Sequence, residues 1–333
     1  MTGRPAGAAT ASDGGELADR ARAGDRRALA RLLTAVENRT PAGEQALRAL
    51  YPLAGAAHLV GITGAPGAGK STLVAALTSV ARLAGRPVAI LAIDPSSPIT
   101  GGAILGDRVR MQQHAGDRDV FIRSMAARGH AGGLAPTTVA ATAVLDAAGF
   151  DLILIETVGT GQSEVEVAAI ADTTVVVEAP EMGDEVQAIK AGLLEVADLV
   201  VVNKADRPGA HRTAAQLRAM LTVGAQQDRA ALAAGRPRPK RPEVLLATAA
   251  TGDGVADLLG ALDRRRPAGP DLGPARVARA RVQLDGILAD RLRHRLDEPR
   301  LAPVVDQLTA DIAAHRLDPY AAADRLLAAL AVG

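Results

Sequence analysis

The sequence predicts an α/β fold in which a mainly parallel sheet is flanked by helices on both faces. Between residues 58 and 262, short apolar runs alternate with segments of helical periodicity, and this alternation is typical of parallel sheets with crossover helices. Ligands of such folds bind at the carboxyl ends of the strands, and the distinctive residues of this chain follow those ends. The expected strands are His58–Thr63, Val88–Asp94, Val120–Ile122, Asp151–Thr157, Thr173–Ala179, Asp198–Lys204 and Val244–Thr248.

The composition limits the classes of function. The 333 residues can hold one α/β domain of about 200 residues plus smaller additions, and the scarcity of aromatics predicts a core of Ala, Val, Leu and Ile. The net charge of +1 gives no general attraction to nucleic acid or to an anionic membrane. Cysteine is absent, which excludes disulfides and thiolate metal sites. No signal-peptide pattern and no apolar stretch of about 18 residues is present, so we expect a cytoplasmic protein.

The first 57 residues predict a helical extension. Residues 1–15 are rich in Gly, Ala, Thr and Ser and are expected to be disordered. Residues 16–53 then show the spacing of two short helices separated at Pro41. Nothing in this extension indicates chemistry, and we expect it to pack on the main domain, residues 58–262.

A glycine-rich loop joins the first strand to a helix expected over residues 70–83. The segment 58–73 reads HLVGITGAPGAGKSTL and fits the P-loop pattern G-x-x-x-x-G-K-[ST] from Gly64 to Ser71. Backbone N–H groups of such a loop and of the following helix N-terminus cradle phosphate oxygens. Lys70 would bind the β- and γ-phosphates, and Ser71 would bind Mg²⁺. The expected contacts to the nucleotide are Gly64, Ala65, Pro66, Gly67, Ala68, Gly69, Lys70, Ser71 and Thr72.

Two aspartates after the second strand are candidate Mg²⁺ ligands. Asp94 ends that strand, and Asp107 lies in the segment DPSSPITGGAILGDRVRM that begins there. Mg²⁺ prefers hard oxygen ligands, usually one or two carboxylates together with phosphate and waters. The alternative is that Asp94 caps a turn while Asp107 forms a solvated charged face with Arg108 and Arg110.

The fourth expected strand ends in ETVG, from Glu156 to Gly159. This segment stands where GTP-binding proteins carry the D-x-x-G that senses the γ-phosphate, and the longer glutamate favours contact with Mg²⁺ through water. In Ras-like proteins a glutamine directly after that glycine orients the attacking water. Here Thr160 follows Gly159, and Gln162 comes two residues later. We therefore expect intrinsic hydrolysis to be slow and to depend on a conformational change or a partner.

A lysine in the next segment has two open interpretations. Only four of the 38 basic residues are lysines. A chain that uses arginine for most positive charges should keep lysine where a compact ammonium is needed, and Lys70 and Lys204 lie in nucleotide motifs. Lys190, in VVVEAPEMGDEVQAIKAG, lies either on an ordinary crossover helix or in a further nucleotide-responsive segment.

Two later strand ends predict the choice of base. The sixth strand runs into NKAD, a match to N-K-x-D that makes Asn203, Lys204 and Asp206 candidate base-binding residues. A carboxylate at Asp206 can accept hydrogen bonds from N1–H and the exocyclic amine of guanine, whereas N1 of adenine is an acceptor. After the seventh strand, Thr248 and Ala249 stand where guanine-binding proteins have a Ser-Ala loop whose backbone contacts the base oxygen. The four motifs in this order predict a GTP-binding domain.

The C-terminal part, residues 263–333, predicts a linker and a helical arm. RRRPAGPDLGP, residues 264–274, is rich in Pro and Gly, and helical spacing follows over 277–296 and 318–330. Short helices bury too little apolar surface alone, so these either dock on the main domain or pair with a second chain. The six histidines lack metal-ligand spacing, and the basic segment GRPRPKRP lacks the aromatics of a nucleic-acid site.

These motifs together resemble one family over nearly the whole chain. The segments that carry the resemblance are GITGAPGAGKSTL, DPSSPITGGAILGDRVRM, ETVGTGQSE, GDEVQAIKAG, NKAD and the late DPYAAADRLL. The family is that of the bacterial methylmalonyl-CoA mutase-associated GTPases, which are similar to the human methylmalonic aciduria type A protein. The resemblance implies a P-loop NTPase fold of the G3E type, hydrolysis of GTP to GDP with Mg²⁺, and a homodimer formed by the C-terminal arm.

The resemblance also implies site roles and a partner. The implied catalytic set is Lys70, Asp94, Asp107, Glu156 and Gly159, and the implied Mg²⁺ set is Ser71, Asp94, Asp107 and Glu156. Residues 178–190 match a switch that relays the nucleotide state, although Glu181 and Met182 stand where the family usually has a glycine-rich segment. The partner would be an adenosylcobalamin-dependent acyl-CoA mutase, for which this chain would gate cofactor loading and protect or reactivate the enzyme. The alternatives are a metallochaperone-type GTPase and the transport-system kinase of older family labels.

Overall fold

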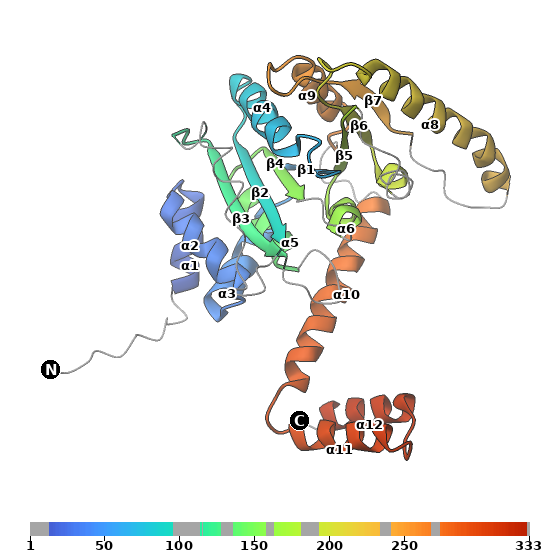
Figure 1. Ribbon diagram of the computed structural model, residues 1–333. Coiled ribbons are helices and arrows are strands. Elements are labelled where there is room, and N and C mark those ends of the chain that lie inside the picture. Colours follow the sequence, from blue (N-terminus) through green and yellow to red (C-terminus); the bar gives the residue numbers. More distant parts are fainter. Residues whose placement is uncertain are drawn as a thin grey trace. The chain divides into compact units, whose positions relative to one another are not determined.

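The computed structural model describes residues 13–95, 114, 116–127, 136–157, 163–180, 193–233, 241–267 and 274–331 (Figure 1). The chain divides into two compact units, Met1–Gly273 and Pro274–Gly333. The first unit contains the sheet and its covering helices, and the second unit is helical. None of the described helices is both long enough and apolar enough to cross a membrane.

Seven strands of the described chain form one parallel sheet in the order β3-β2-β4-β1-β5-β6-β7. They are β1 (His58–Gly64), β2 (Val88–Pro95), β3 (Val120–Ala127), β4 (Leu152–Thr157), β5 (Thr173–Glu178), β6 (Leu199–Val202) and β7 (Glu243–Leu246). This arrangement confirms the predicted α/β fold, with β3 running on beyond its expected end at Ile122. Because all strands are parallel, their carboxyl ends meet at one edge of the sheet, where β1 lies between β4 and β5.

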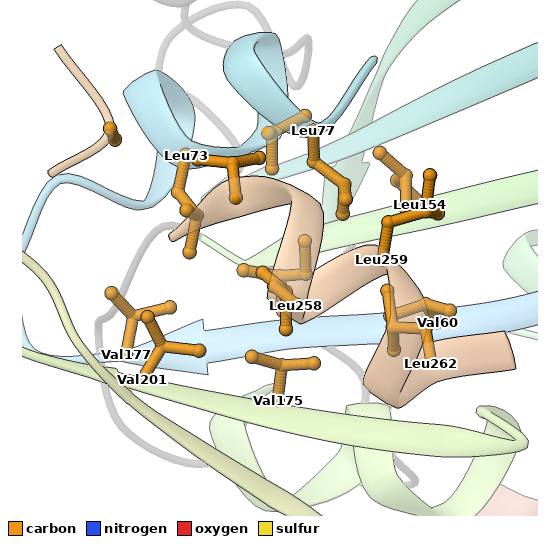
Figure 2. Packing of buried hydrophobic residues seen from close by; sticks show 14 of the residues in the cluster. Val60, Leu73, Leu77, Leu154, Val175, Val177, Val201, Leu258, Leu259 and Leu262 are labelled. Carbon is orange, nitrogen blue, oxygen red and sulfur yellow. The ribbon is translucent and has the colours of Figure 1, made fainter. Parts of the chain in front are cut away.

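Helices cover both faces of this sheet. They are α4 (Lys70–Leu83), α5 (Pro136–Ala147), α6 (Ser163–Ile170), α8 (Ala210–Ala233) and α9 (Val255–Asp263). On one face α4 and α9 pack together over Val60, Leu154 and Val175, all completely buried (Figure 2). On the other face α5 and α6 cover Ile153 and Ile155, and α8 packs beside β6 and β7. The core is built mostly from Ala, Val, Leu and Ile, as the composition requires.

The N-terminal extension contains three helices where two were expected. They are α1 (Asp13–Arg22), α2 (Arg26–Glu37) and α3 (Pro41–Leu50), followed by a short 3₁₀ turn η1 (Tyr51–Leu53). The expected first helix is interrupted because Gly24 has a φ of +87° and Asp25 then caps α2 by accepting two backbone N–H groups. Pro41 begins α3 behind the capping residue Thr40, a position that suits proline. The extension packs on the face of the sheet that α5 covers.

The second unit consists of α10 (Pro274–Leu296), α11 (Ala302–Ala313) and α12 (Pro319–Ala331). The expected helices correspond to α10 and α12, and α11 lies between them in the sequence. Helices α11 and α12 pack against each other and bury Leu308 and Leu330. Helix α10 instead exposes the large apolar side chains Val277, Leu284, Ile287, Leu288 and Leu292.

Candidate nucleotide-binding site

Two glycines shape the loop between β1 and α4. Gly64 has a φ of +133°, and a Cβ atom there would lie 2.1 Å from the carbonyl oxygen of Val177 on β5. Gly69, the N-cap of α4, has a φ of +91°, and a Cβ atom there would lie 2.4 Å from Nδ2 of Asn203. A side chain at position 64 would therefore clash with the backbone of β5, and one at position 69 would displace Asn203. It brings the N-terminus of α4, with its partial positive charge and backbone N–H groups, to the carboxyl edge of the sheet.

The Lys70 side chain is buried inside this loop. Its Nζ donates hydrogen bonds to the backbone oxygens of Gly64 at 2.7 Å and Ala65 at 3.1 Å. An ammonium in this position adds a positive charge to the N–H groups of the loop, which suits a phosphate ligand. The geometry is therefore compatible with the role predicted for Lys70.

Ser71 and Glu156 meet behind the loop. The Ser71 hydroxyl donates to Oε1 of Glu156 at 2.5 Å, and both residues are buried. Glu156 shares its face of β4 with Leu152 and Leu154, because side chains alternate along a strand, and this face is covered by α4. A hydroxyl and a carboxylate side by side provide the hard oxygen ligands that Mg²⁺ prefers. This pair of side chains therefore fits a magnesium ion.

Asn203 connects three loops of the site. Its Nδ2 donates to the backbone oxygen of Ala68 in the P-loop at 2.9 Å, and its Oδ1 accepts from the backbone N–H of Ala249 at 3.0 Å. The side chain is buried, with 2% exposure of the residue. The loops after β1, β6 and β7 are thus held together by one amide group. The Ala249 N–H already donates to Asn203 Oδ1. To bind a base oxygen, this N–H would have to share its hydrogen between the two oxygens or give up the bond to Asn203.

Lys204 makes a second link between NKAD and the P-loop. Its Nζ donates to the backbone oxygen of Gly67 at 2.7 Å. Its φ is +56°, which is uncommon for a residue with a side chain and marks a locally constrained position. Asp206 follows two residues later and is exposed, so its carboxylate is open to a ligand.

The loop after β7 is ordered by its own backbone hydrogen bonds. Thr248 and Ala249 are both buried, and the Thr248 N–H donates to the backbone oxygen of Asp253 at 2.9 Å. The Ala205 N–H donates to the backbone oxygen of Ala247 at 3.0 Å, which joins NKAD to this loop. The two expected base-binding segments therefore lie side by side.

Other predicted site residues are described partly or not at all. Asp94 lies on β2, which pairs with β4 and β3 at the carboxyl edge of the sheet, but its side chain is outside the described atoms. The residues outside the described ranges are Asp107, Arg108, Arg110, Gly159, Thr160, Gln162, Glu181, Met182 and Lys190. Their predicted roles stay predictions.

One buried pair of hydroxyl groups was missed by the sequence analysis. Thr157 Oγ1 donates to Thr63 Oγ1 at 3.3 Å, and both residues are completely buried. The pair connects the ends of β4 and β1 directly beside Glu156 and Gly64. The available signal was a threonine at the end of each apolar run, which any strand end could carry.

At this level the fold and the site define a P-loop nucleotide-binding protein whose base-binding segment has the sequence typical of guanine selection. Comparison with known proteins narrows this class to a family. Residues 29–297 match the family model described as methylmalonyl Co-A mutase-associated GTPase MeaB. The chain therefore belongs to this family and is a GTPase, which confirms the predicted resemblance.

Individual relatives agree with this assignment. A putative GTPase of Pyrococcus abyssi is 43% identical over 315 residues, which cover 94% of this chain and 95% of the relative. The mitochondrial methylmalonic aciduria type A homolog of Mus musculus is 34% identical over 277 residues, 81% of this chain and 65% of the relative. A crystal structure described as LAO/AO transport system kinase has a TM-score of 0.65 and 25% identity, covering 96% of this chain and 98% of the other.

Proposed function

We propose that this protein is a GTPase chaperone of an adenosylcobalamin-dependent acyl-CoA mutase, with methylmalonyl-CoA mutase as the first candidate. The observation that carries the proposal is the family match over residues 29–297, because the family is described by its association with that mutase. The name of the mouse relative, methylmalonic aciduria type A homolog, supports the same class of partner. GTP hydrolysis would gate loading of the cobalamin cofactor and protect or reactivate the mutase.

In this proposal the phosphates are bound by the P-loop. Backbone N–H groups of the loop and of the α4 N-terminus hold the β- and γ-phosphates. Lys70 exchanges its carbonyl partners at Gly64 and Ala65 for phosphate oxygens, which an ammonium binds more strongly than it binds neutral carbonyls. Little covalent chemistry is required of the protein, because phosphoryl transfer is accelerated mainly by positioning and charge stabilisation.

Magnesium would be held in this proposal by Ser71 and Glu156, with Asp94 and Asp107 as further carboxylates. The proximity of the Ser71 hydroxyl to the Glu156 carboxylate supports the first pair. When bound, the ion would supply positive charge next to the oxygens of the transferred phosphoryl group. Gly159, which follows Glu156 closely in the sequence, would sense the γ-phosphate.

Guanine is selected by Asp206, whose carboxylate accepts from N1–H and the exocyclic amine. Asn203 and Lys204 keep the base-binding segment at a fixed distance from the P-loop through their bonds to Ala68 and Gly67. A nucleotide whose phosphates occupy the P-loop is then presented to Asp206 in one orientation.

The proposal includes a homodimer, a cytoplasmic location and three functional parts with the boundaries 1–57, 58–262 and 263–333. The exposed apolar side chains of α10 support burial of that helix in an interface. Docking of the C-terminal helices on the GTPase domain is the alternative, and sedimentation of the purified protein would distinguish the two. Residues 178–190 would relay the nucleotide state to the mutase.

The proposal is tested by GTP turnover of the purified protein, alone and with a cobalamin-loaded methylmalonyl-CoA mutase. ATP serves as the control nucleotide and Lys70→Ala as the inactive control protein. We expect a slow basal rate that is selective for GTP and rises strongly with the mutase. A normal basal rate that the mutase leaves unchanged would remove the mutase as the partner and leave the GTPase assignment intact.

A second candidate function is phosphoryl transfer to a transport component, which the description of the similar crystal structure favours. The NKAD sequence argues against an ATP-dependent kinase. Competition of unlabelled ATP against labelled GTP tests this alternative, since a kinase of that type should bind ATP at least as well as GTP.

A further inference from the structure

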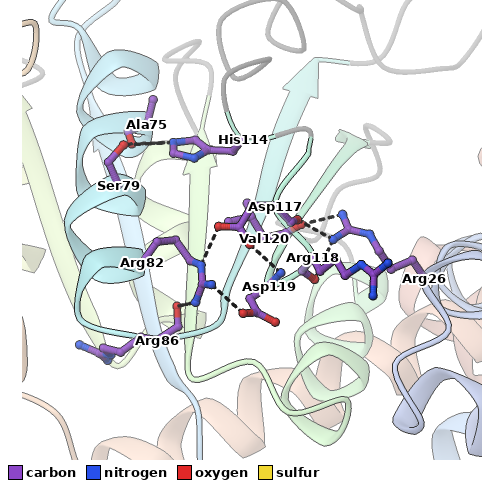
Figure 3. A network of polar contacts seen from close by, with 10 residues as sticks. All are labelled: Arg26, Ala75, Ser79, Arg82, Arg86, His114, Asp117, Arg118, Asp119 and Val120. Carbon is purple, nitrogen blue, oxygen red and sulfur yellow. Dashed lines mark hydrogen bonds and ion pairs between the residues drawn. The ribbon is translucent and has the colours of Figure 1, made fainter.

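A polar network joins three parts of the chain at one side of α4 (Figure 3). The parts are helix α2 of the N-terminal extension, helix α4 behind the P-loop, and a turn formed by residues 116–120, which we call the β3 turn. This turn leads into β3, the outermost strand of the described sheet on that side. In the sequence, it closes the segment that carries Asp107.

Helix α4 holds the β3 turn through ionic contacts. Arg82 donates from Nε to Asp117 at 2.8 Å and from Nη2 to Asp119 at 2.6 Å. The hydrogen bond from Arg82 lowers the pKa of Asp117 below its ordinary value, so both partners stay charged at neutral pH. Just before the turn, Nε2 of His114 lies 3.0 Å from the backbone oxygen of Ala75 on the same helix.

Helix α2 holds the turn from the other side through one guanidinium group. Arg26 donates from Nη1 to the backbone oxygens of Asp117 at 2.9 Å and Arg118 at 2.8 Å, and from Nη2 to that of Val120 at 2.6 Å. The guanidinium also lies 5.6 Å from the ring centre of Phe121, within reach of a cation–π contact. Only arginine offers several donors in a rigid planar fork, so lysine could replace no more than part of these bonds.

The arrangement makes the β3 turn a shared support of the extension and the GTPase domain. Arg82 and the site residues Lys70 and Ser71 lie on one helix, and an α-helix is stiff over this length. The family model match begins at residue 29, so Arg26 lies outside the part of the chain that the match covers. The sequence of the extension likewise contains no motif that indicates chemistry.

We propose that Arg26 is a positioning residue for GTP hydrolysis, which it supports by fixing the β3 turn against α4. Within the part of the chain that the structure describes, the hydrogen bonds of the Arg26 guanidinium go to the turn and not to the candidate nucleotide site, so Arg26 acts through the turn. The hydrogen bonds described for Lys70, Asn203 and Lys204 go to the P-loop and not to the turn. Loss of Arg26 should therefore slow the chemical step and leave nucleotide affinity intact.

Three variants test this inference in the full-length protein. Arg26→Ala removes the donors, Arg26→Gln retains part of the stem beside Phe121 with one donor group, and Arg27→Ala is the matched control at the exposed neighbouring position. For each we would measure kcat and KM for GTP, GDP affinity and the melting temperature, with kcat referred to the concentration of GDP-binding sites. We expect Arg26→Ala to lower kcat about tenfold, which is less than the roughly 100-fold that a 1 Å misplacement from a remote change can cost.

The expected pattern separates positioning from mere stabilisation. In Arg26→Ala the GDP affinity should equal that of the wild type, Arg26→Gln should recover part of kcat, and Arg27→Ala should match the wild type throughout. If Arg26→Ala does not fold, Arg26→Gln carries the test, and we expect it to show a smaller loss of kcat than tenfold at normal GDP affinity. A lowered melting temperature with unchanged kcat would overturn the inference and leave the GTPase assignment standing, whereas a wild type without GTP turnover would overturn that assignment itself.

Discussion

Replacing Gly69 by alanine should weaken guanine nucleotide binding far more than the same change at Gly67. Both glycines have a positive φ, +91° and +78° respectively, so alanine costs about 1–2 kcal/mol of backbone strain at either position. The surroundings differ. A Cβ atom at position 67 meets nothing within 4 Å, whereas a Cβ atom at position 69 lies 2.4 Å from Nδ2 of Asn203.

The contact at position 69 must displace the Asn203 side chain, because a real Cβ atom does not approach a nitrogen so closely. Displacement breaks the bond from Nδ2 to Ala68 and the bond from the Ala249 N–H to Oδ1, each worth about 1 kcal/mol net. The P-loop then loses its fixed distance to the base-binding segment. A cost of about 2 kcal/mol beyond that of Gly67→Ala corresponds to about 30-fold weaker binding of GDP.

Equilibrium titration with a fluorescent GDP analogue measures this difference, and a thermal unfolding scan shows whether the two variants are folded. We expect Gly69→Ala to bind about 30-fold more weakly than Gly67→Ala, and to stay folded with a melting temperature lower by roughly 4–8 °C because the two bonds of Asn203 are lost. Equal affinities of the two variants would refute the reasoning, because the backbone strain is common to both and the contact with Asn203 is not.

Three further changes have defined outcomes. Asp206→Ala should reduce the preference for GTP over ATP about 100-fold, since two hydrogen bonds to a charged group are lost; nucleotide competition measures it, and unchanged selectivity would contradict it. Burial lowers the pKa of His58 to about 4 from an ordinary value of 6.5. The unfolded chain therefore binds the proton more readily, and stability should fall by about 3 kcal/mol as the pH drops from 6.5 towards 4. Urea unfolding at several pH values gives the unfolding free energy as a function of pH. This free energy should depend less on pH for His58→Gln than for the wild type, and an equal pH dependence would be inconsistent with this cause. Asp146 accepts from the backbone N–H groups of Gly55 and Ala57, so Asp146→Ala should cost about 3 kcal/mol of unfolding free energy; a loss too small to measure would show that water can replace the carboxylate.

The sheet could be predicted from the sequence because parallel strands are buried on both faces. Such strands appear as continuous apolar runs, and LILI in β4 and VVV in β5 are of this kind. The N-terminal extension was predicted less well. Its helical periodicity continues past residue 24, and the break depends on the local conformation of Gly24 and on the capping carboxylate of Asp25. Both are short-range features that a periodic pattern does not contain.

The members of the site could be named from motifs, but their contacts with one another could not. Asn203 bonds to Ala68 and Ala249, which are far away in the sequence and meet only in the folded sheet. The hydrogen bond between Ser71 and Glu156 likewise requires α4 to lie over β4. Nothing in the sequence indicates the contacts of Arg26, because its partners are backbone oxygens and every residue has one.

Binding of GDP in competition with ADP tests most directly whether the loops after β1, β6 and β7 form one guanine nucleotide site. The bonds from Asn203 and Lys204 to the P-loop predict tight binding of GDP that a large excess of ADP does not displace. If ADP displaced GDP at concentrations similar to those of GDP, this account of the site would be wrong. The P-loop would then bind the phosphates while the protein did not distinguish guanine from adenine.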